Sequence, residues 1–167
     1  GVVLAEFLRE LADCLSGGDA DVLHRVCESA LEAVDEDVHV GNDVMLVLDR
    51  SGSISSSELT TLKSAAKAFV DALALSAGGV HAGEDSFSTT ATLDEHLTDD
   101  AVALKATIDG LSAGGFTNLV DGITVGKTEL DNPGDGHDRP DGESPDFMVV
   151  ITDGAPNRCP GGIPCTE

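Results

Sequence analysis

In the stretch VMLVLDRSGS, residues 44–53, five consecutive apolar residues are followed at once by an aspartate and a short polar turn. A continuous apolar run is typical of a strand buried on both faces, as in a parallel sheet. The stretch FMVVITD, residues 147–153, repeats this arrangement and ends at Asp153. Two such strands predict that both terminal aspartates lie at the carboxyl edge of one sheet, where open parallel sheets bind ligands.

Apolar residues recur at helical spacing between and before these strands. The first two helical segments, residues 3–15 and 21–34, are predicted to form a hairpin that turns at Gly17 and Gly18. We therefore expect an N-terminal helical hairpin with its linker over residues 1–40 and an α/β domain over residues 41–167. The fold class is a doubly wound, mostly parallel, Rossmann-like sheet flanked by helices. The first of its helices is predicted to start at a capping box formed by Ser55 and Glu58 and to stop at Gly78 and Gly79. Two more helices are predicted, one over residues 98–111 and one over residues 119–130 after an Asn118 cap.

A second strand is expected around residues 80–88, although it contains Glu84 and Asp85 side by side. Successive side chains of a strand point to opposite faces, so one of these carboxylates must face the core in either register. We therefore predict a distorted or destabilised strand here. A short edge strand over residues 89–93 and a solvated polar loop over residues 131–146 complete the expected elements.

The turn after the first strand places oxygen donors at alternate positions: Asp49, Ser51 and Ser53. Two carboxylates at one sheet edge are costly unless a cation accompanies them. Oxygen ligands of low total charge suit Mg²⁺, which requires octahedral geometry and retains water ligands. The alternative is that the two serines cap the following helix and that the aspartates are solvated.

Asp49-Arg50-Ser51-Gly52-Ser53 resembles the DxSxS motif of the metal-ion-dependent adhesion site of von Willebrand factor A-type domains. The segments at residues 114–118 and 152–154 resemble the loops that supply that family's threonine and last acidic residue, so the similarity covers residues 43–157. The resemblance implies a Mg²⁺ site, with Mn²⁺ or Ca²⁺ as alternatives, in which Ser51, Ser53 and Thr117 bind directly. Asp49 and Asp153 would act mostly through water, and a carboxylate of a partner protein would complete the octahedron.

Members of that family usually continue with two more strands and their helices. The resemblance therefore implies a C-terminally incomplete domain in which the strand at 147–151 is an unprotected apolar edge, open to self-association. Because the sequence begins with Gly1, we expect a processed product, a trimmed chain or a fragment.

Charge excludes one class of function. The 31 Asp and Glu residues outnumber the 9 Lys and Arg residues, for a formal net charge of −22. Nucleic-acid binding is not expected, because phosphates would be repelled. Acids spread along the whole chain indicate a halophilic protein, with an ordinary acidic secreted protein as the alternative. No run of eighteen apolar residues is present, so no membrane span is expected.

The four cysteines allow several states. Cys159 and Cys165 flank turn-forming residues and are expected to form a small disulfide-closed loop, which is favoured over a zinc site because no CxxC pair is present. Cys14 and Cys27 are either buried thiols or a bridge. The loop cysteines favour an oxidising compartment, outside the cell or at its surface.

No enzyme is indicated. Residues 122–128 are similar to a Walker A loop but have one residue too few between the glycines and lie within a predicted helix. His81 and His96 have no motif context and are expected to be surface residues. The leading hypothesis is a metal-dependent adhesion or protein-binding module. The alternatives are a structural subunit of a surface filament or particle, and a subunit that accompanies an ATPase.

Overall fold

The structure, a computed structural model, describes residues 41–141, 144–153, 156–159 and 163–164. The predicted N-terminal hairpin, with Cys14 and Cys27, and also Cys165 lie outside the described residues. The strands are β1 (Asp43–Asp49), β2 (His81–Phe87), β3 (Ala91–Thr98), β4 (Asp146–Ile151), β5 (Arg158–Cys159) and β6 (Ile163–Pro164). The helices are α3 (Ser56–Leu73), α4 (Ala101–Gly110) and α5 (Leu119–Leu130).

A four-stranded sheet in the order β3-β2-β1-β4 forms the centre of the molecule. Strand β1 pairs in parallel with both β2 and β4, whereas β3 pairs antiparallel to β2. The predicted α/β fold is therefore confirmed as a mixed, mostly parallel sheet. Strand β4 is the outer strand on its side of this sheet, as predicted for residues 147–151.

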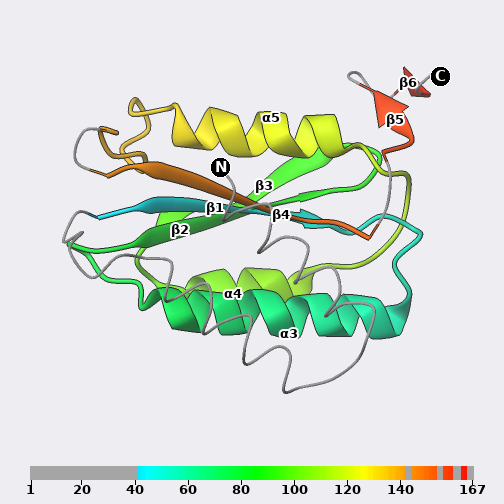
Figure 1. The fold of residues 1–167 in the computed structure, drawn as a ribbon, viewed down its shortest axis with the longest axis horizontal. Coiled ribbons are helices and arrows are strands. Elements are labelled where there is room, and N and C mark those ends of the chain that lie inside the picture. The colour runs from blue at the N-terminus through cyan, green and yellow to red at the C-terminus, as the bar shows by residue number, and fades with distance from the viewer. Residues whose placement is uncertain (1–40, 142–143, 154–155, 160–162, 165–167) are drawn as a thin grey trace, which may run out of the picture.

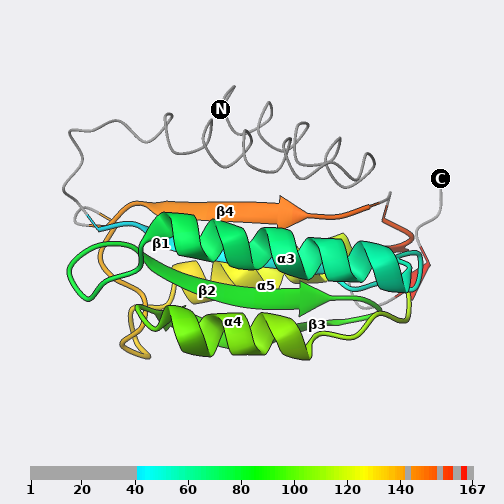
Figure 2. The same ribbon diagram turned by 90° about the horizontal axis from the view of Figure 1, so that it is seen from below.

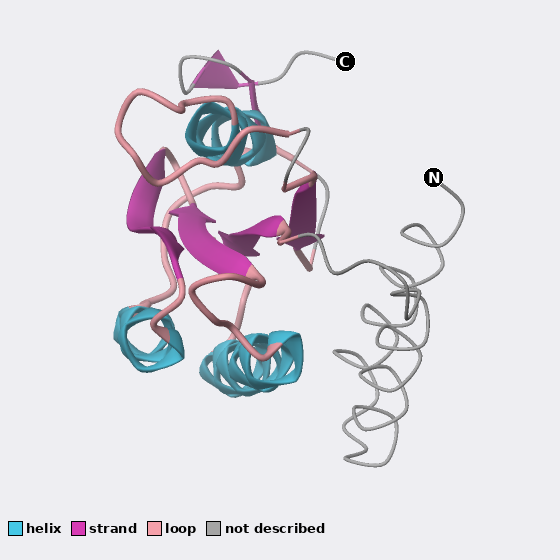
Figure 3. Ribbon diagram, turned by 90° about the vertical axis from the view of Figure 1, so that its left-hand side faces the viewer, coloured by secondary structure: helices cyan, strands magenta, loops and turns pink. Residues whose placement is uncertain are grey.

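Helices cover both faces of the sheet (Figure 1). Helix α5 lies on one face, and α3 and α4 lie side by side on the other (Figures 2 and 3). All seven residues of β1 are buried, which explains why its sequence is an unbroken apolar run. The larger core lies between the sheet and α3 and α4, and its members include Leu46, Leu48, Ala66, Val70, Leu104 and Ile108.

Two predicted helix starts are confirmed, and one predicted helix end is wrong. Ser55 is the N-cap of α3 in a capping box with Glu58, and Asn118 caps α5, both as predicted. The end predicted for α3 at Gly78 and Gly79 is wrong, because the helix stops at Leu73 and Ala74 adopts the left-handed conformation at φ 50°. An alanine can occupy this conformation at a modest cost, and nothing in its sequence signals that it does.

Strand β2 deviates from regular pairing where its two acids lie. Its pairing with β1 is continuous, but its register with β3 shifts between Ala82 and Glu84 and again between Glu84 and Asp85. The predicted distortion therefore lies on the β3 side only. Strand β3 is longer than predicted and runs from Ala91 to Thr98.

Candidate metal centre

The turn between β1 and α3 links four of the predicted site residues by hydrogen bonds. Asp49 is fully buried at the end of β1, and its Oδ1 accepts from the backbone N–H of Ser51 at 2.8 Å. The hydroxyls of Ser51 and Ser53 lie 2.9 Å apart, and the Ser53 hydroxyl donates to Asp153 Oδ1 at 3.1 Å. Asp49, Ser51, Ser53 and Asp153 thus form one connected group at the carboxyl ends of β1 and β4.

The loop that carries Thr117 lies directly against this turn. The N–H of Gly52 donates to the carbonyl of Gly115 at 3.0 Å, and the N–H of Gly114 donates to the carbonyl of Arg50 at 2.8 Å. A Cβ on Gly52 would lie 2.9 Å from that Gly115 carbonyl, so this close approach requires glycine. Thr117 itself is buried, with its N–H bonded to Asn157 Oδ1 at 2.9 Å.

The serine hydroxyls are not needed as helix caps. The N-cap of α3 is Ser55, whose side chain accepts from the N–H of Glu58. The alternative in which Ser51 and Ser53 cap the helix is therefore wrong. Their hydroxyls instead bond to each other and to Asp153, where they remain available as oxygen ligands.

The group is buried at one end and open to solvent at the other. Asp49 and Ser51 are buried, whereas Ser53 and Asp153 are exposed. Desolvation raises the pKa of the Asp153 carboxyl, and the nearby charge of Asp49 adds to this rise, while the hydrogen bond from Ser53 lowers the pKa. The connected group offers two carboxylates and two hydroxyls, and this all-oxygen donor set fits a hard divalent cation such as Mg²⁺.

Three supporting residues were not predicted. Thr152 donates its hydroxyl to Asp49 Oδ2 at 2.6 Å, and Asn157 holds the backbone of Thr117. The guanidinium of Arg158 lies over the ring of Phe116, 3.6 Å from its centroid. Only Thr152 had a sequence signal, since it directly precedes Asp153 at the end of the strand.

Two further groups of possible metal ligands occur among the described residues, and neither includes the predicted site. One consists of His96, Glu129 and Asp135, and the other of Asp43, Asp138 and Asp146. His96 is exposed, as predicted, but its ring bonds to the buried Glu129 carboxylate at 3.0 Å and stacks on His137 at 4.4 Å.

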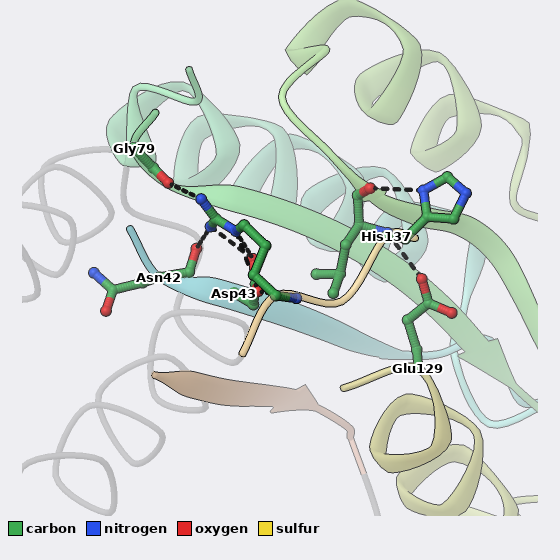
Figure 4. Close-up of polar contacts among 7 residues, drawn as sticks. Asn42, Asp43, Gly79, Glu129 and His137 are labelled. Atoms are coloured by element: carbon green, nitrogen blue, oxygen red, sulfur yellow. Dashed lines mark hydrogen bonds and ion pairs between the residues drawn. The ribbon is translucent and has the colours of Figure 1, made fainter. Parts of the chain in front are cut away.

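The loop over residues 131–146 is not simply solvated, so that prediction needs correction. Asp138 is buried, and Arg139 bonds to residues at the amino ends of β1 and β2. The Arg139 guanidinium donates to the Asp43 carboxylate, at 2.7 Å from Nη2, and to the carbonyls of Asn42 and Gly79 (Figure 4). The loop returns to the sheet because a fully buried Asp43 requires a counter-charge there.

Residues 122–128 lie within α5, as predicted, which is not the strand-to-helix loop that binds nucleotides. In the described part of the chain, no helix is both long and apolar enough to cross a membrane.

Comparisons with known proteins agree with this architecture. A family model described as the von Willebrand factor type A domain matches residues 43–163. The fold is similar to that of the three N-terminal domains of the type V pili tip protein Mfa5 from Porphyromonas gingivalis. That likeness has 20% identity and a TM-score of 0.53, over 56% of this chain and 18% of that chain.

A second solved structure shares the fold. It is the PilB minor pilin from Streptococcus sanguinis, with 22% identity and a TM-score of 0.59, over 74% of this chain and 32% of that chain. At these identities the likeness is one of fold, and this chain spans less than a third of either pilus protein. No curated protein matches the chain.

Proposed function

The chain belongs to the von Willebrand factor type A domain family, and we propose that it is a divalent-metal-dependent protein-binding module. Members of this family are generally non-catalytic, bind proteins and often bind a divalent cation. The proposed metal, Mg²⁺ with Mn²⁺ or Ca²⁺ as alternatives, lies at the carboxyl end of β1. Ser51, Ser53 and Thr117 are the direct ligands, and Asp49 and Asp153 act through water.

The observation that carries this proposal is the hydrogen-bonded series that joins Asp49, Ser51, Ser53 and Asp153. Hydroxyls that bond to one another can turn to a cation without loss of a structural role, because Ser55 already caps α3. Bound metal supplies an electrophilic centre with few direct anionic ligands. A carboxylate from an Asp or Glu of a partner protein is then the favoured remaining ligand.

Titration calorimetry with Mg²⁺ and Mn²⁺ tests the site. We expect one ion per chain at the site and a loss of affinity of about tenfold or more in Ser53→Ala and Asp49→Ala. Ser64→Ala is the matched control, because Ser64 is an exposed serine of α3 whose hydroxyl only bonds the carbonyl of Thr60. Equal affinity in Ser53→Ala and Ser64→Ala would contradict the proposal.

A second candidate function is a structural subunit of a surface filament or particle, assembled through the open edge of β4. Phe147 on this edge strand is 50% exposed, and the solved structures of similar fold come from a pilus tip protein and a minor pilin. The same likeness motivates a location at the cell surface.

The division into a hairpin over 1–40 and a domain over 41–167 remains a prediction, which limited proteolysis near residue 40 would test.

A further inference from the structure

Three carboxylates converge at the amino end of the sheet, opposite the proposed metal centre. Asp43 begins β1 and Asp146 begins β4, and these two residues are register partners in the parallel pairing. The loop before β4 brings Asp138 to the same place. One carboxylate oxygen from each of the three residues lies within 4.8 Å of the other two.

Asp138 is the observation that distinguishes this group from an ordinary acidic surface. The residue is only 8% exposed, and its Oδ1 is buried without a hydrogen-bond partner among the described residues. Asp146 Oδ1 is likewise buried and unpartnered in the described part of the chain. Burial of two carboxylate oxygens without a hydrogen-bond donor is costly, and a bound cation would remove that cost.

The charge balance favours a divalent ion. Both oxygens of Asp43 accept hydrogen bonds from Arg139, so this arginine offsets one of the three negative charges. The remaining charge of two belongs to Asp138 and Asp146. Desolvation raises the pKa of Asp146 to about 6, and the charges of Asp138, Asp141 and other nearby acids add to the rise.

We propose that Asp43, Asp138 and Asp146 form a second divalent-cation site, which takes Ca²⁺ and fastens the loop before β4 to the amino end of the sheet. Two oxygens on one ion can be separated by at most twice the metal–oxygen distance, about 4.2 Å for Mg²⁺ and about 5 Å for Ca²⁺. One oxygen of each carboxylate lies within 4.8 Å of the other two, so a single Ca²⁺ ion can contact all three. Ca²⁺ also accepts the irregular geometry and the carbonyl ligands that a loop provides.

This site is separate from the proposed adhesion site. Asp43 and Asp49 stand at opposite ends of the seven-residue strand β1, about 20 Å apart at roughly 3.3 Å per residue. The two sites therefore share no ligand. Either one can exist without the other.

Thermal unfolding of the full 167-residue chain tests the proposal, with Ca²⁺ or Mg²⁺ added after chelator treatment at a constant high KCl concentration. Constant salt removes the general effect of ionic strength on so acidic a chain. The test variant is Asp138→Asn/Asp146→Asn, and the matched control is Asp71→Asn/Asp109→Asn. The control removes the same charge from side chains that are 61% and 57% exposed on α3 and α4.

We expect Ca²⁺ to raise the unfolding temperature of the wild type and the control more than Mg²⁺ does. The test variant should lose most of this response and should bind Ca²⁺ at least about tenfold more weakly in calorimetry. Without Ca²⁺, its unfolding temperature should equal or exceed that of the wild type, because repulsion between the carboxylates has been removed. If the double variant does not fold, Asp138→Asn alone serves for the same comparison.

An equal Ca²⁺ response in the test variant and the wild type would overturn the proposal. Ser53→Ala separates this outcome from failure of the adhesion site. It should lose Mg²⁺ affinity at the carboxyl end of β1 and keep the Ca²⁺ response, whereas loss of the Ca²⁺ response in Ser53→Ala would also overturn the second site.

Discussion

Glu84 and Asp85 carry two adjacent carboxyl groups that are buried inside the protein, and these groups make its stability depend on pH. None of their four oxygens has a hydrogen-bond partner among the described residues. Glu84 shares a strand face with Ala82, a member of the core under α3 and α4, whereas Asp85 faces Gly126 of α5. Desolvation is the main cause that raises their pKa values, to about 9 for Glu84 and about 8 for Asp85, and the charge of Asp94 raises both further.

A carboxyl whose pKa is raised by folding stabilises the protein at low pH and loses that contribution as the pH rises through its folded-state pKa. We therefore predict that the free energy of unfolding falls between pH 7 and pH 9, by on the order of 1 kcal/mol per pH unit. Exposed carboxyls and most histidines titrate below this window. Urea unfolding of the wild type and of Glu84→Gln/Asp85→Asn measures the effect, and the variant should show a much flatter profile. Parallel pH profiles in the two proteins would show that these carboxyls titrate normally.

Arg139 is predicted to be the most important basic residue for stability. Its guanidinium is the counter-charge of Asp43, which has no exposed side-chain surface. Removal of one partner from a buried ion pair leaves an uncompensated charge, so Arg139→Met should cost about 3–5 kcal/mol. Lys127→Met is the control, since Lys127 forms a solvent-exposed pair with Asp131 and its loss should change stability far less. Urea unfolding in the presence of a chelator compares the two, and equal losses would mean that Asp43 does not depend on Arg139.

The sequence predicts contacts between residues that lie close together along the chain, but not contacts between residues that lie far apart along it. Asp49, Ser51 and Ser53 lie within one turn after a strand, so their spacing alone indicates that they gather. Asp43 and Arg139 are separated by 96 positions, and Arg139 lies in an acidic loop with no recognisable pattern. Their pairing depends on the register of β1 with β4, which sequence spacing does not reveal.

Helix α5 packs closely against the sheet at Gly126. Gly126 faces the sheet, and a Cβ there would lie 2.7 Å from Asp85 Oδ2 and 3.1 Å from a methyl of Val47. Alanine is otherwise the better helix former by about 1 kcal/mol. Gly126→Ala should nevertheless destabilise the protein by about 1–3 kcal/mol, because the helix must move away from the sheet.

Gly110 of α4 is the matched control, since a Cβ there would meet no atom within 4 Å. Gly110→Ala should leave stability unchanged or raise it by up to about 1 kcal/mol. Denaturant unfolding of the two variants should therefore give shifts of opposite sign or very different size. A stabilised Gly126→Ala would show that α5 packs more loosely than these distances indicate.

The elements themselves were largely predictable, because their signals are local. The apolar runs of β1 and β4 and the caps at Ser55 and Asn118 all have the predicted structure. The length of β3 and the end of α3 were predicted wrongly. Strand β3 is an edge strand with only Leu97 buried, so its sequence lacks a strong apolar pattern.

The large negative net charge of the chain should make its stability depend on salt. With 31 acidic and 9 basic residues, the chain repels itself at low ionic strength. The Debye length falls from about 10 Å at 0.1 M salt to about 3 Å at 1 M, which screens this repulsion. We predict that the unfolding temperature rises by about 5 °C or more between 0.1 M and 2 M KCl, corresponding to on the order of 1 kcal/mol. A flat or falling unfolding temperature would contradict a halophilic origin.

The outer edge of β4 is a candidate surface for assembly. Among the described residues, β4 pairs only with β1, so the backbone groups on its other side form no ladder. Unpaired, apolar edges are templates for strand addition, and native sheets usually protect them with charges, bulges or a covering segment. Phe147 on this strand is 50% exposed, so the edge strand presents an apolar side chain to solvent.

We therefore predict that the 167-residue chain self-associates through β4 in a concentration-dependent manner, which sedimentation measures directly. Phe147→Lys should shift the species toward monomer, because a charge on an edge strand opposes pairing with a second copy. Val102→Lys is the matched control, since Val102 is 76% exposed on α4 and lies on a different part of the surface. Amide hydrogen exchange at residues 147–151 separates the two explanations of a negative result. A monomer in which all these amides are strongly protected means that the edge is already paired within the chain, and β4 is then not an assembly surface.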